Sequence, residues 1–352
     1  MKRLLPILLF SLASLQAQPS PEALIRDGHY KRARGILEQR YQANPNDPET
    51  LRLLSQIRQA WGDSATAVTL AEKALASHPR DARYHLRLAD ALGDEAQKAG
   101  VFRQLGLARR FKSEVEATLA LDPNNTEALS MLMGYYWMAP GIMGGDKAQA
   151  RAIPERILKI DPVKGYDAAA TLAQWEKKPV DYDDLARKAL QASPNSYDAL
   201  VSMANRGVNS KPPRLAEAEG YARQAIRIDA TRVDAYSSLA AALALQAKWP
   251  EVDAALSDAE KAVPDNLAPY IRVANVCVMK GTELGRGERY ARQYLAQEPE
   301  AGYPRRAYAH WRLGLILEKQ GRKPEAIAEL QNAVKLDANS PARQDLKRIK
   351  GN

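Results

Sequence analysis

A short turn signature recurs along almost the whole chain and constrains the fold more than any other feature. Most copies end a run of apolar and small residues with Pro or Ala beside Asp or Asn, as in "LALDPNNTEA" and "LQASPNSYDA". Proline lacks a backbone donor and ends one helix, while Asp or Asn caps the next helix. The copies close, at a spacing near 34 residues, at Pro45, Pro79, Pro123, Pro162, Pro194, Ala230, Pro264, Pro299 and Ala338.

The segments between these turns have helical periodicity, with apolar residues three and four positions apart. The period therefore predicts about nine helical hairpins, and a hairpin of this size cannot bury its apolar face alone. Neighbouring hairpins must stack into one continuous core, so residues 18–352 form one repeat domain. The last stretch, "SPARQDLKRIKGN", is expected to be a polar capping helix.

The most regular unit, 307–338, carries the residues of a known repeat. Its first helix holds an aromatic residue, a Leu-Gly pair and a further Leu, and its second holds spaced Ala and Leu; these are Trp311, Leu313, Gly314, Leu317, Ala326, Leu330 and Ala333. This pattern resembles the tetratricopeptide repeat, over roughly residues 20 to 350. The resemblance implies an all-α, right-handed superhelical solenoid. Two departures are a short unit at 163–194 and Pro154, inside an expected second helix.

The chain begins with the layout of a secretory signal peptide. Lys2 and Arg3 precede an apolar run from Leu4 to Ala13, and a small residue, Ala17, follows shortly after. We expect residues 1–17 to be removed after Ala17, which predicts a periplasmic or secreted protein. The alternatives are an uncleaved anchor and a buried first helix, although the run is shorter than the ~20 residues that span a bilayer. No later segment has the composition of an integral membrane span.

The net charge and the cysteine content limit which partners and which disulfide bonds the sequence allows. The formal charge of +9 falls to +7 without Lys2 and Arg3, and it is spread along the chain. Such a distribution favours weak attraction to acidic surfaces but does not indicate a nucleic-acid partner. The single cysteine, Cys277, cannot form an intramolecular disulfide and is expected to be a buried small apolar residue.

The stretch "YYWMAPGIMGGDKAQA" contains a glycine-rich turn that invites comparison with a phosphate-binding loop. A phosphate loop follows a strand and places Lys and a hydroxyl residue after Gly. Here a helix precedes the turn, Asp146 precedes Lys147, and Ala148 takes the place of the hydroxyl residue. We therefore interpret the stretch as a structured turn, in which Pro140 ends one helix and Asp146 starts the next.

The same turn resembles a motif in exported bacterial repeat proteins, and more weakly in periplasmic repeat proteins associated with TRAP-type solute transporters. The matching residues are Tyr135, Tyr136, Pro140, Gly144, Gly145, Lys147 and Ala148. The resemblance implies a docking or ligand-handling role outside the membrane. The aromatic residues Tyr135, Tyr136 and Trp137 are interpreted either as hairpin core or as groups that face a groove beside the loop.

Residues with catalytic chemistry are sparse. The four histidines are dispersed, and the sequence contains neither an HExxH nor a GxSxG motif. The acidic run Asp181–Asp184 is expected to cap a helix that begins near Leu185. We therefore expect no enzymatic activity, no catalytic residue, no metal site and no cofactor.

Binding is the remaining function. In the repeat that this chain resembles, first helices line the concave face and present certain of their positions to a partner. Arginine beside amide and aromatic groups suits a carboxylate or an extended peptide. The alternative is that Arg52 is solvated and Trp311 belongs to the core. The positions that follow from the resemblance are Arg52, Gln56, Gln59, Trp137, Tyr308, Trp311 and Glu318.

The sequence thus predicts a non-catalytic scaffold of the bacterial cell envelope that binds a protein or peptide in a concave groove. The alternative is an accessory of a periplasmic transporter, with a small acidic ligand near the Gly141–Lys147 loop.

Overall fold

The computed structural model describes residues 19–302 and 304–351, and the expected signal peptide at 1–17 lies outside them. The described residues form α-helices joined by short turns, with one 3-10 helix and no strand. The helices of the first half are α1 (Pro21–Arg26), α2 (Tyr30–Ala43), α3 (Pro48–Ala60), α4 (Ser64–Ser77), α5 (Ala82–Lys98), α6 (Val101–Leu121), α7 (Thr126–Met138), α8 (Lys147–Ile160) and α9 (Pro162–Glu176).

The second half continues in the same manner. Its helices are α10 (Tyr182–Ala192), α11 (Tyr197–Asn209), α12 (Leu215–Ile228), α13 (Val233–Leu245), α14 (Trp249–Ala262), α15 (Ala268–Lys280), α16 (Leu284–Leu295), α17 (Arg306–Lys319), α18 (Lys323–Leu336) and α19 (Ala342–Lys350). Each odd-numbered helix up to α17 pairs with the even-numbered helix that follows it. The described residues therefore form nine hairpins and a capping helix, which confirms the predicted all-α solenoid.

The recurring turns act as the sequence indicates. The Asp47 carboxylate accepts a hydrogen bond from the Thr50 N–H at 2.8 Å, and Pro48 occupies the first helical position of α3. Asn125 caps α7 in the same way, with its side-chain oxygen 3.0 Å from the Ala128 nitrogen. These contacts satisfy backbone donors that a helix start leaves free.

Small residues allow the two helices of a hairpin to approach closely. In the last hairpin, a Cβ at Gly314 would lie 2.8 Å from Leu330 Cγ, and Ala326 is fully buried beside it. The departure at Pro154 does not end α8, which continues to Ile160. Pro154 instead lines a groove of about 400 Å³ between α8 and α9.

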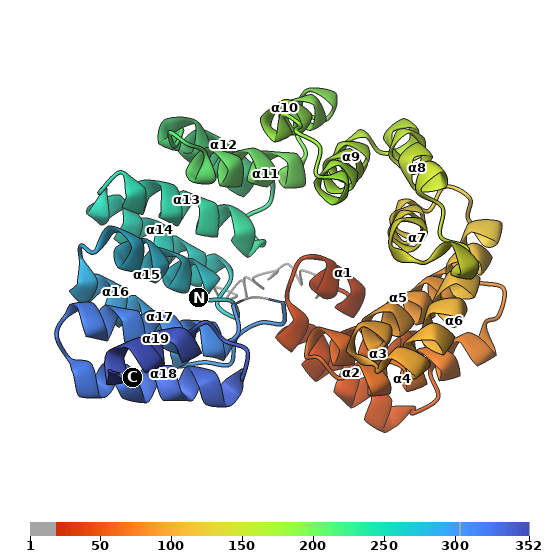
Figure 1. Cartoon of the computed structure of the whole chain (residues 1–352), viewed down its shortest axis with the longest axis horizontal. Coiled ribbons are helices and arrows are strands. Elements are labelled where there is room, and N and C mark those ends of the chain that lie inside the picture. The colour runs from red at the N-terminus through yellow and green to blue at the C-terminus, as the bar shows by residue number, and fades with distance from the viewer. Residues whose placement is uncertain (1–18, 303, 352) are drawn as a thin grey trace, which may run out of the picture.

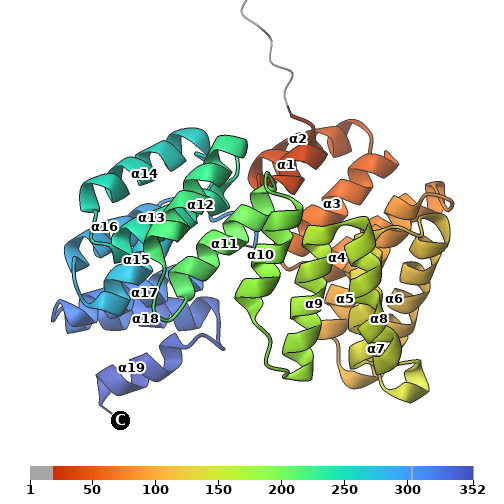
Figure 2. The same ribbon diagram turned by 90° about the horizontal axis from the view of Figure 1, so that it is seen from above.

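The apolar core is divided along the solenoid. One buried cluster runs from Leu24 to Tyr84, another from Ala89 to Leu172, and a large one from Ala204 to Ile349. Between the second and third clusters, α10 is short and buries only Ala186 and Ala189. Figure 2 shows the resulting two arcs, α1–α9 and α11–α19, with α10 between them.

The solenoid curves so far that its two ends meet, as Figure 1 shows, with α7 nearer the centre of the ring than α8. The N-terminal hairpin contacts the turns before α15 and α17 through hydrogen bonds and ion pairs. We call this set of contacts the clasp. Its members are His29, Lys31 and Arg34 on one side and Asp265, Glu298 and Glu300 on the other.

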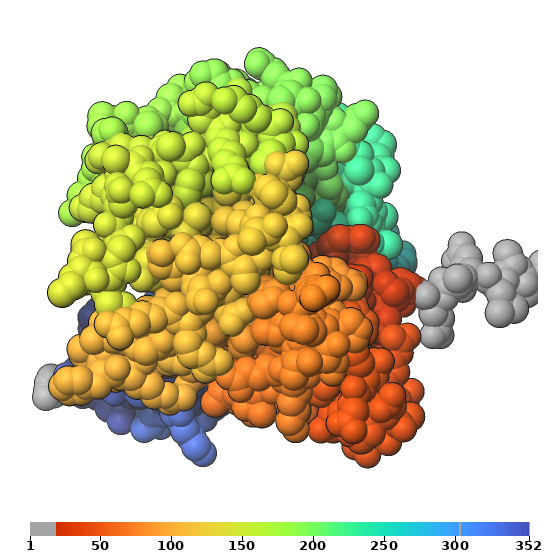
Figure 3. Space-filling model, turned by 90° about the vertical axis from the view of Figure 1, so that its right-hand side faces the viewer, coloured from red at the N-terminus to blue at the C-terminus, as the bar shows by residue number. Residues whose placement is uncertain are grey.

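Several hydrogen bonds connect the two sides of the clasp. His29 Nδ1 lies 2.9 Å from Asp265 Oδ2, and the Lys31 backbone N–H donates to both Glu300 oxygens at 3.2 and 3.1 Å. Lys31 Nζ donates to the Glu298 carbonyl at 2.6 Å, and Arg34 pairs with the Glu298 carboxylate at 2.8 Å. Figure 3 shows residues of the first described helices, in red, beside residues of the second half, in teal.

None of the described helices is both long enough and apolar enough to span a bilayer.

Candidate functional site

The glycine-rich turn after α7 has a fixed geometry. Residues Gly141–Met143 form a 3-10 helix, and Gly144 has a φ of +84°, which favours glycine. At Gly145, a Cβ would lie 1.8 Å from the Ala139 carbonyl oxygen, so no other residue fits. Asp146 then caps α8 by accepting from the Ala148 and Gln149 N–H groups. The turn joins two helices, as expected for a structured turn.

The buried side chain of Tyr135 stabilises this turn. Its hydroxyl donates to the Met143 carbonyl at 2.6 Å, and its ring stacks on Phe111 at 6.1 Å. A buried tyrosine hydroxyl needs such an acceptor. Tyr135 is therefore part of the hairpin core and is not available to a ligand.

The Trp137 ring is in contact with an aromatic ring and with cationic side chains. It stacks on Trp175 of α9 with a centroid distance of 6.3 Å, and Lys147 Nζ lies 4.8 Å from its ring centroid. Arg151 is a second cation near the ring at 5.9 Å. Lys147 thus stabilises a neighbouring indole through a cation–π contact. Tyr136, the remaining predicted aromatic residue, is half-buried.

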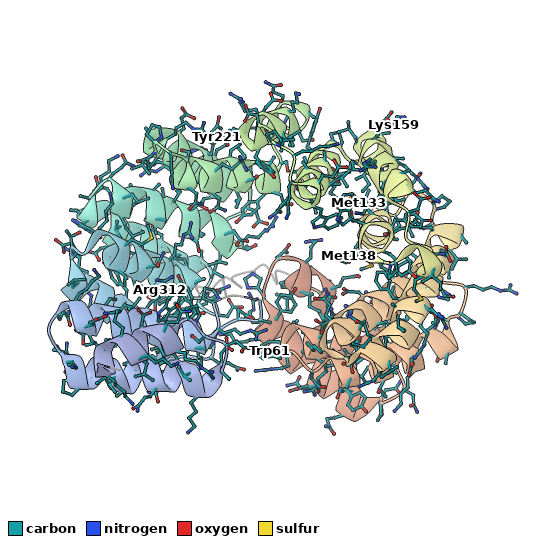
Figure 4. All side chains as sticks on the ribbon, in the orientation of Figure 1. Trp61, Met133, Met138, Lys159, Tyr221 and Arg312 are labelled. Carbon is teal, nitrogen blue, oxygen red and sulfur yellow. The ribbon has the colours of Figure 1, made fainter. Side chains whose placement is uncertain are left out.

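The exposed apolar residues at this turn are ones that the sequence analysis missed. Met138 is 72% exposed and Ile142 is 95% exposed. Figure 4 places Met138 on the inner side of the ring. Their signal in the sequence was a large apolar residue at the end of α7 and another inside the glycine-rich turn, where no core is available.

Arg52 on α3 is 8% exposed and is already bound to carboxylates of its own chain. Its Nη2 contacts Glu49 at 2.6 Å and Glu22 of α1 at 2.7 Å. The hydrogen bond from Arg52 holds the pKa of Glu49 below its ordinary value. Gln59 accepts a hydrogen bond from Arg87, and Gln56 is half-buried on the same helix. The predicted carboxylate partner of Arg52 is thus present inside the chain.

The predicted residues of the last repeat lie under the capping helix. The Trp311 indole N–H donates to Asp345 of α19 at 2.8 Å, and Arg312 lies 3.8 Å from the same ring. Tyr308 packs edge-on against Trp311, and Glu318 pairs with Arg348 of α19. The structure therefore brings Tyr308, Trp311 and Glu318 together, apart from Arg52 and from the turn after α7.

A polar pocket of about 810 Å³ lies between the start of α10, the end of α11 and the 210–214 turn. Asp183 bridges two arginines here, with Oδ1 2.7 Å from Arg206 Nε and Oδ2 2.6 Å from Arg214 Nη2. Burial of the Asp183 carboxyl would raise its pKa, but the hydrogen bonds from Arg214 and Arg206 outweigh this and hold it below the ordinary value. The Tyr182 ring lies 5.6 Å from the Arg206 guanidinium.

The sequence of this acidic run predicts only a helix cap. Asp181 does cap α10, accepting from the Asp184 N–H at 3.0 Å. However, the expected start near Leu185 was wrong, because Asp181 caps the first turn and α10 begins at Tyr182. The pocket itself was missed, since Arg206 and Arg214 reach Asp183 from the next hairpin and no local motif connects them.

Solved structures similar to this chain include tetratricopeptide repeat proteins. Yeast Tom70 aligns with a TM-score of 0.49 and 14% identity, over 94% of this chain and 86% of that chain. TTC0263, a thermophilic TPR protein in Thermus thermophilus, aligns with a TM-score of 0.45 and 21% identity, over 53% and 94%. A tetratricopeptide repeat protein from Parabacteroides merdae aligns with a TM-score of 0.43 and 15% identity, over 87% and 99%.

No protein-family model and no curated protein matches the chain. The assignment of the fold rests on the nine hairpins themselves, and the resemblance to transporter-associated repeat proteins stays a prediction.

Proposed function

We propose that this protein is a non-catalytic scaffold that binds a polypeptide partner on the inner surface of its ring. The observation that carries the proposal is the stack of inner helices, which forms an extended curved surface of the kind that solenoids use for recognition. Met138, large, apolar and exposed on that surface, is of a residue type enriched in interfaces.

We also propose that the partner belongs to the bacterial cell envelope. The support is the secretory layout of residues 1–17, which lie outside the described residues. Cell fractionation of the expressed full-length gene, with detection of the mature N-terminus, tests this part separately from partner binding.

Site-specific photocrosslinking in cells tests the binding surface. A photoreactive amino acid replaces Met138 on the inner side, and in a matched control it replaces Leu336, which is 56% exposed at the end of α18 in the outer layer. We expect a discrete crosslinked polypeptide from position 138 and none from position 336. Crosslinking from position 336 alone, or from neither position, contradicts the proposal.

A solute-handling role remains a second candidate, and the observation that favours it is the polar pocket beside α11. The sequence favours an acidic ligand near the Gly141–Lys147 loop, whereas this pocket lies at 180–214. The two roles differ in the size of the ligand and in the surface that it contacts.

A further inference from the structure

The pocket between α10, α11 and the 210–214 turn contains donors that lack acceptors. Arg206 and Arg214 each contact Asp183 through one guanidinium nitrogen. In the part of the chain that the structure describes, the remaining guanidinium nitrogens have no hydrogen-bond acceptor. Arg214 Nε is buried without a hydrogen bond, and the Glu217 carboxylate lies 3.7 Å from it. Lys211 and Ser202 also line the pocket without a hydrogen-bond partner among the described residues. A buried donor without an acceptor is costly, which favours a ligand that supplies oxygen atoms.

The acidic groups of the pocket are already engaged. Both Asp183 oxygens contact the two arginines, and Asp181 accepts from the Asp184 N–H and from Arg187. The lining carries three cations and two carboxylates, hence a net charge of +1. A lining with more cations than carboxylates favours an anionic ligand, and the forked guanidinium donors match the two oxygens of a carboxylate.

Asp183 also gives the pocket its rigidity. Its carboxylate binds the guanidinium groups of Arg206 on α11 and of Arg214 at the start of α12. The Tyr182 ring lies beside Arg206. Guanidinium groups held in one orientation lose little entropy when they bind a second carboxylate, and their forked donors match its two oxygens.

We propose that this pocket is a binding site for a carboxylate group, carried either by a small dicarboxylic acid or by an acidic peptide segment. The site is distinct from the inner-surface binding proposed above, and neither proposal requires the other. Arg206 and Arg214 supply paired donors, while Lys211 and Ser202 supply single donors on the rim.

Isothermal titration of the full-length protein at low ionic strength tests the proposal with three probes. The first is succinate, the second is an aspartate-rich pentapeptide with an acetylated N-terminus and an amidated C-terminus, and the third is the asparagine version of that peptide with the same blocked ends. We expect succinate, the aspartate peptide or both to bind, and the asparagine peptide not to bind.

Variants locate the site. We expect Arg206→Gln to weaken binding about tenfold, because a charge-assisted pair is lost, and Lys211→Ala to weaken it about threefold, because Lys211 is exposed and screened. Arg227→Gln removes an exposed charge of α12 outside the pocket and should leave the affinity unchanged. Thermal melting of each variant checks the fold, and Lys211→Ala, which removes a side chain without a partner in the described chain, should melt like the wild type.

Each outcome of the titration either identifies the kind of ligand or contradicts the proposal. Binding of succinate alone assigns the site to small acids, and binding of the aspartate peptide alone assigns it to peptide carboxylates. The proposal is overturned if neither probe binds, if the asparagine peptide binds equally well, or if Arg206→Gln and Lys211→Ala bind like the wild type. Crosslinking from Met138 in the earlier experiment is unaffected by any of these results.

Discussion

Two glycines of the turn after α7 occupy very different surroundings. A Cβ at Gly145 meets the Ala139 carbonyl carbon at 2.6 Å and its oxygen at 1.8 Å, and both atoms belong to the backbone. A Cβ at Gly141 meets nothing within 4 Å. The same substitution at these two positions therefore compares a forbidden contact with open space in one short loop.

We expect Gly145→Ala to lower the free energy of unfolding by about 3 kcal/mol, because backbone cannot yield as a flexible side chain does. Gly141→Ala should change it by less than about 0.5 kcal/mol. Denaturant titration of both variants measures the difference. Equal stabilities would mean that the turn has another backbone arrangement available.

The candidate residues divide according to what a sequence can reveal. The core position of Tyr135 could be predicted, since it follows from helical spacing within one hairpin. The engagement of Arg52 by Glu22 could not, because the partner lies 30 positions away on a helix of only six residues. Lys147 and Trp137 meet across a turn whose path depends on Gly144 and Gly145, so their contact requires the folded loop.

At the scale of elements, α10 and α13 show how unevenly the solenoid is packed. Ten of the residues of α13 are buried, while α10 buries only Ala186 and Ala189. A helix with few buried apolar contacts opens more readily.

We expect amide hydrogens of α10 to exchange with solvent about 100-fold faster than those of α13, because local opening exposes little apolar surface there. Hydrogen exchange followed by mass spectrometry, with peptides that cover both helices, measures this directly. Similar protection of the two helices would show that the divided core does not weaken the α9–α11 junction.

The positions of most helices follow from local chemistry, and the sequence predicted them well. Asp and Pro pairs at Asp47–Pro48 and Asp161–Pro162 mark helix starts that the structure reproduces. The capping helix was also expected near its observed place. What local patterns do not encode is that Asp345 and Arg348 of α19 form hydrogen bonds with Trp311 and Glu318 of α17.

At the scale of the whole molecule, the closed ring depends on contacts between residues 236 to 269 positions apart. No repeat period contains such information, because closure depends on small rotations summed over nine hairpins. The clasp is also chemically unlike the rest of the stack. Within the described residues, no buried apolar cluster spans it. In Figure 4, Trp61 marks the junction, where Arg34 lies 4.5 Å from the indole ring.

A charge reversal in the clasp should change shape more than stability. The Arg34–Glu298 pair is partly exposed, with side chains 29% and 50% accessible, so its loss costs little free energy of unfolding. We expect Arg34→Glu to enlarge the radius of gyration measured by small-angle X-ray scattering, since two carboxylates then repel across the junction. Adding Glu298→Arg should restore the compact form. An unchanged radius in the single variant would show that the remaining contacts suffice for closure.

Glu300 should make closure dependent on pH. Burial raises its pKa from 4.5 to about 7, despite the hydrogen bonds from the Lys31 and Ala301 N–H groups. The charged or titratable groups around it are Lys31, Asp265, Tyr30, Arg34 and Tyr294. Because the closed ring holds this proton more tightly than an open one, the contribution of Glu300 to closure is complete below its ordinary value and is lost as pH rises through about 7.

Asp265 acts in the opposite direction and in a more acidic range. Burial would raise its pKa, but the hydrogen bond and charge of His29 hold it below the ordinary value, so its contribution is lost only as pH falls through that lowered value. Closure should therefore weaken as the pH rises from about 5 to about 8.5. Fluorescence energy transfer between dyes on the two arcs measures this change. Glu300→Gln, which carries no titrating proton, should abolish this dependence, and Glu251→Gln on the exposed face of α14 should retain it. A wild-type pH profile in Glu300→Gln would contradict the assignment of this pH dependence to Glu300.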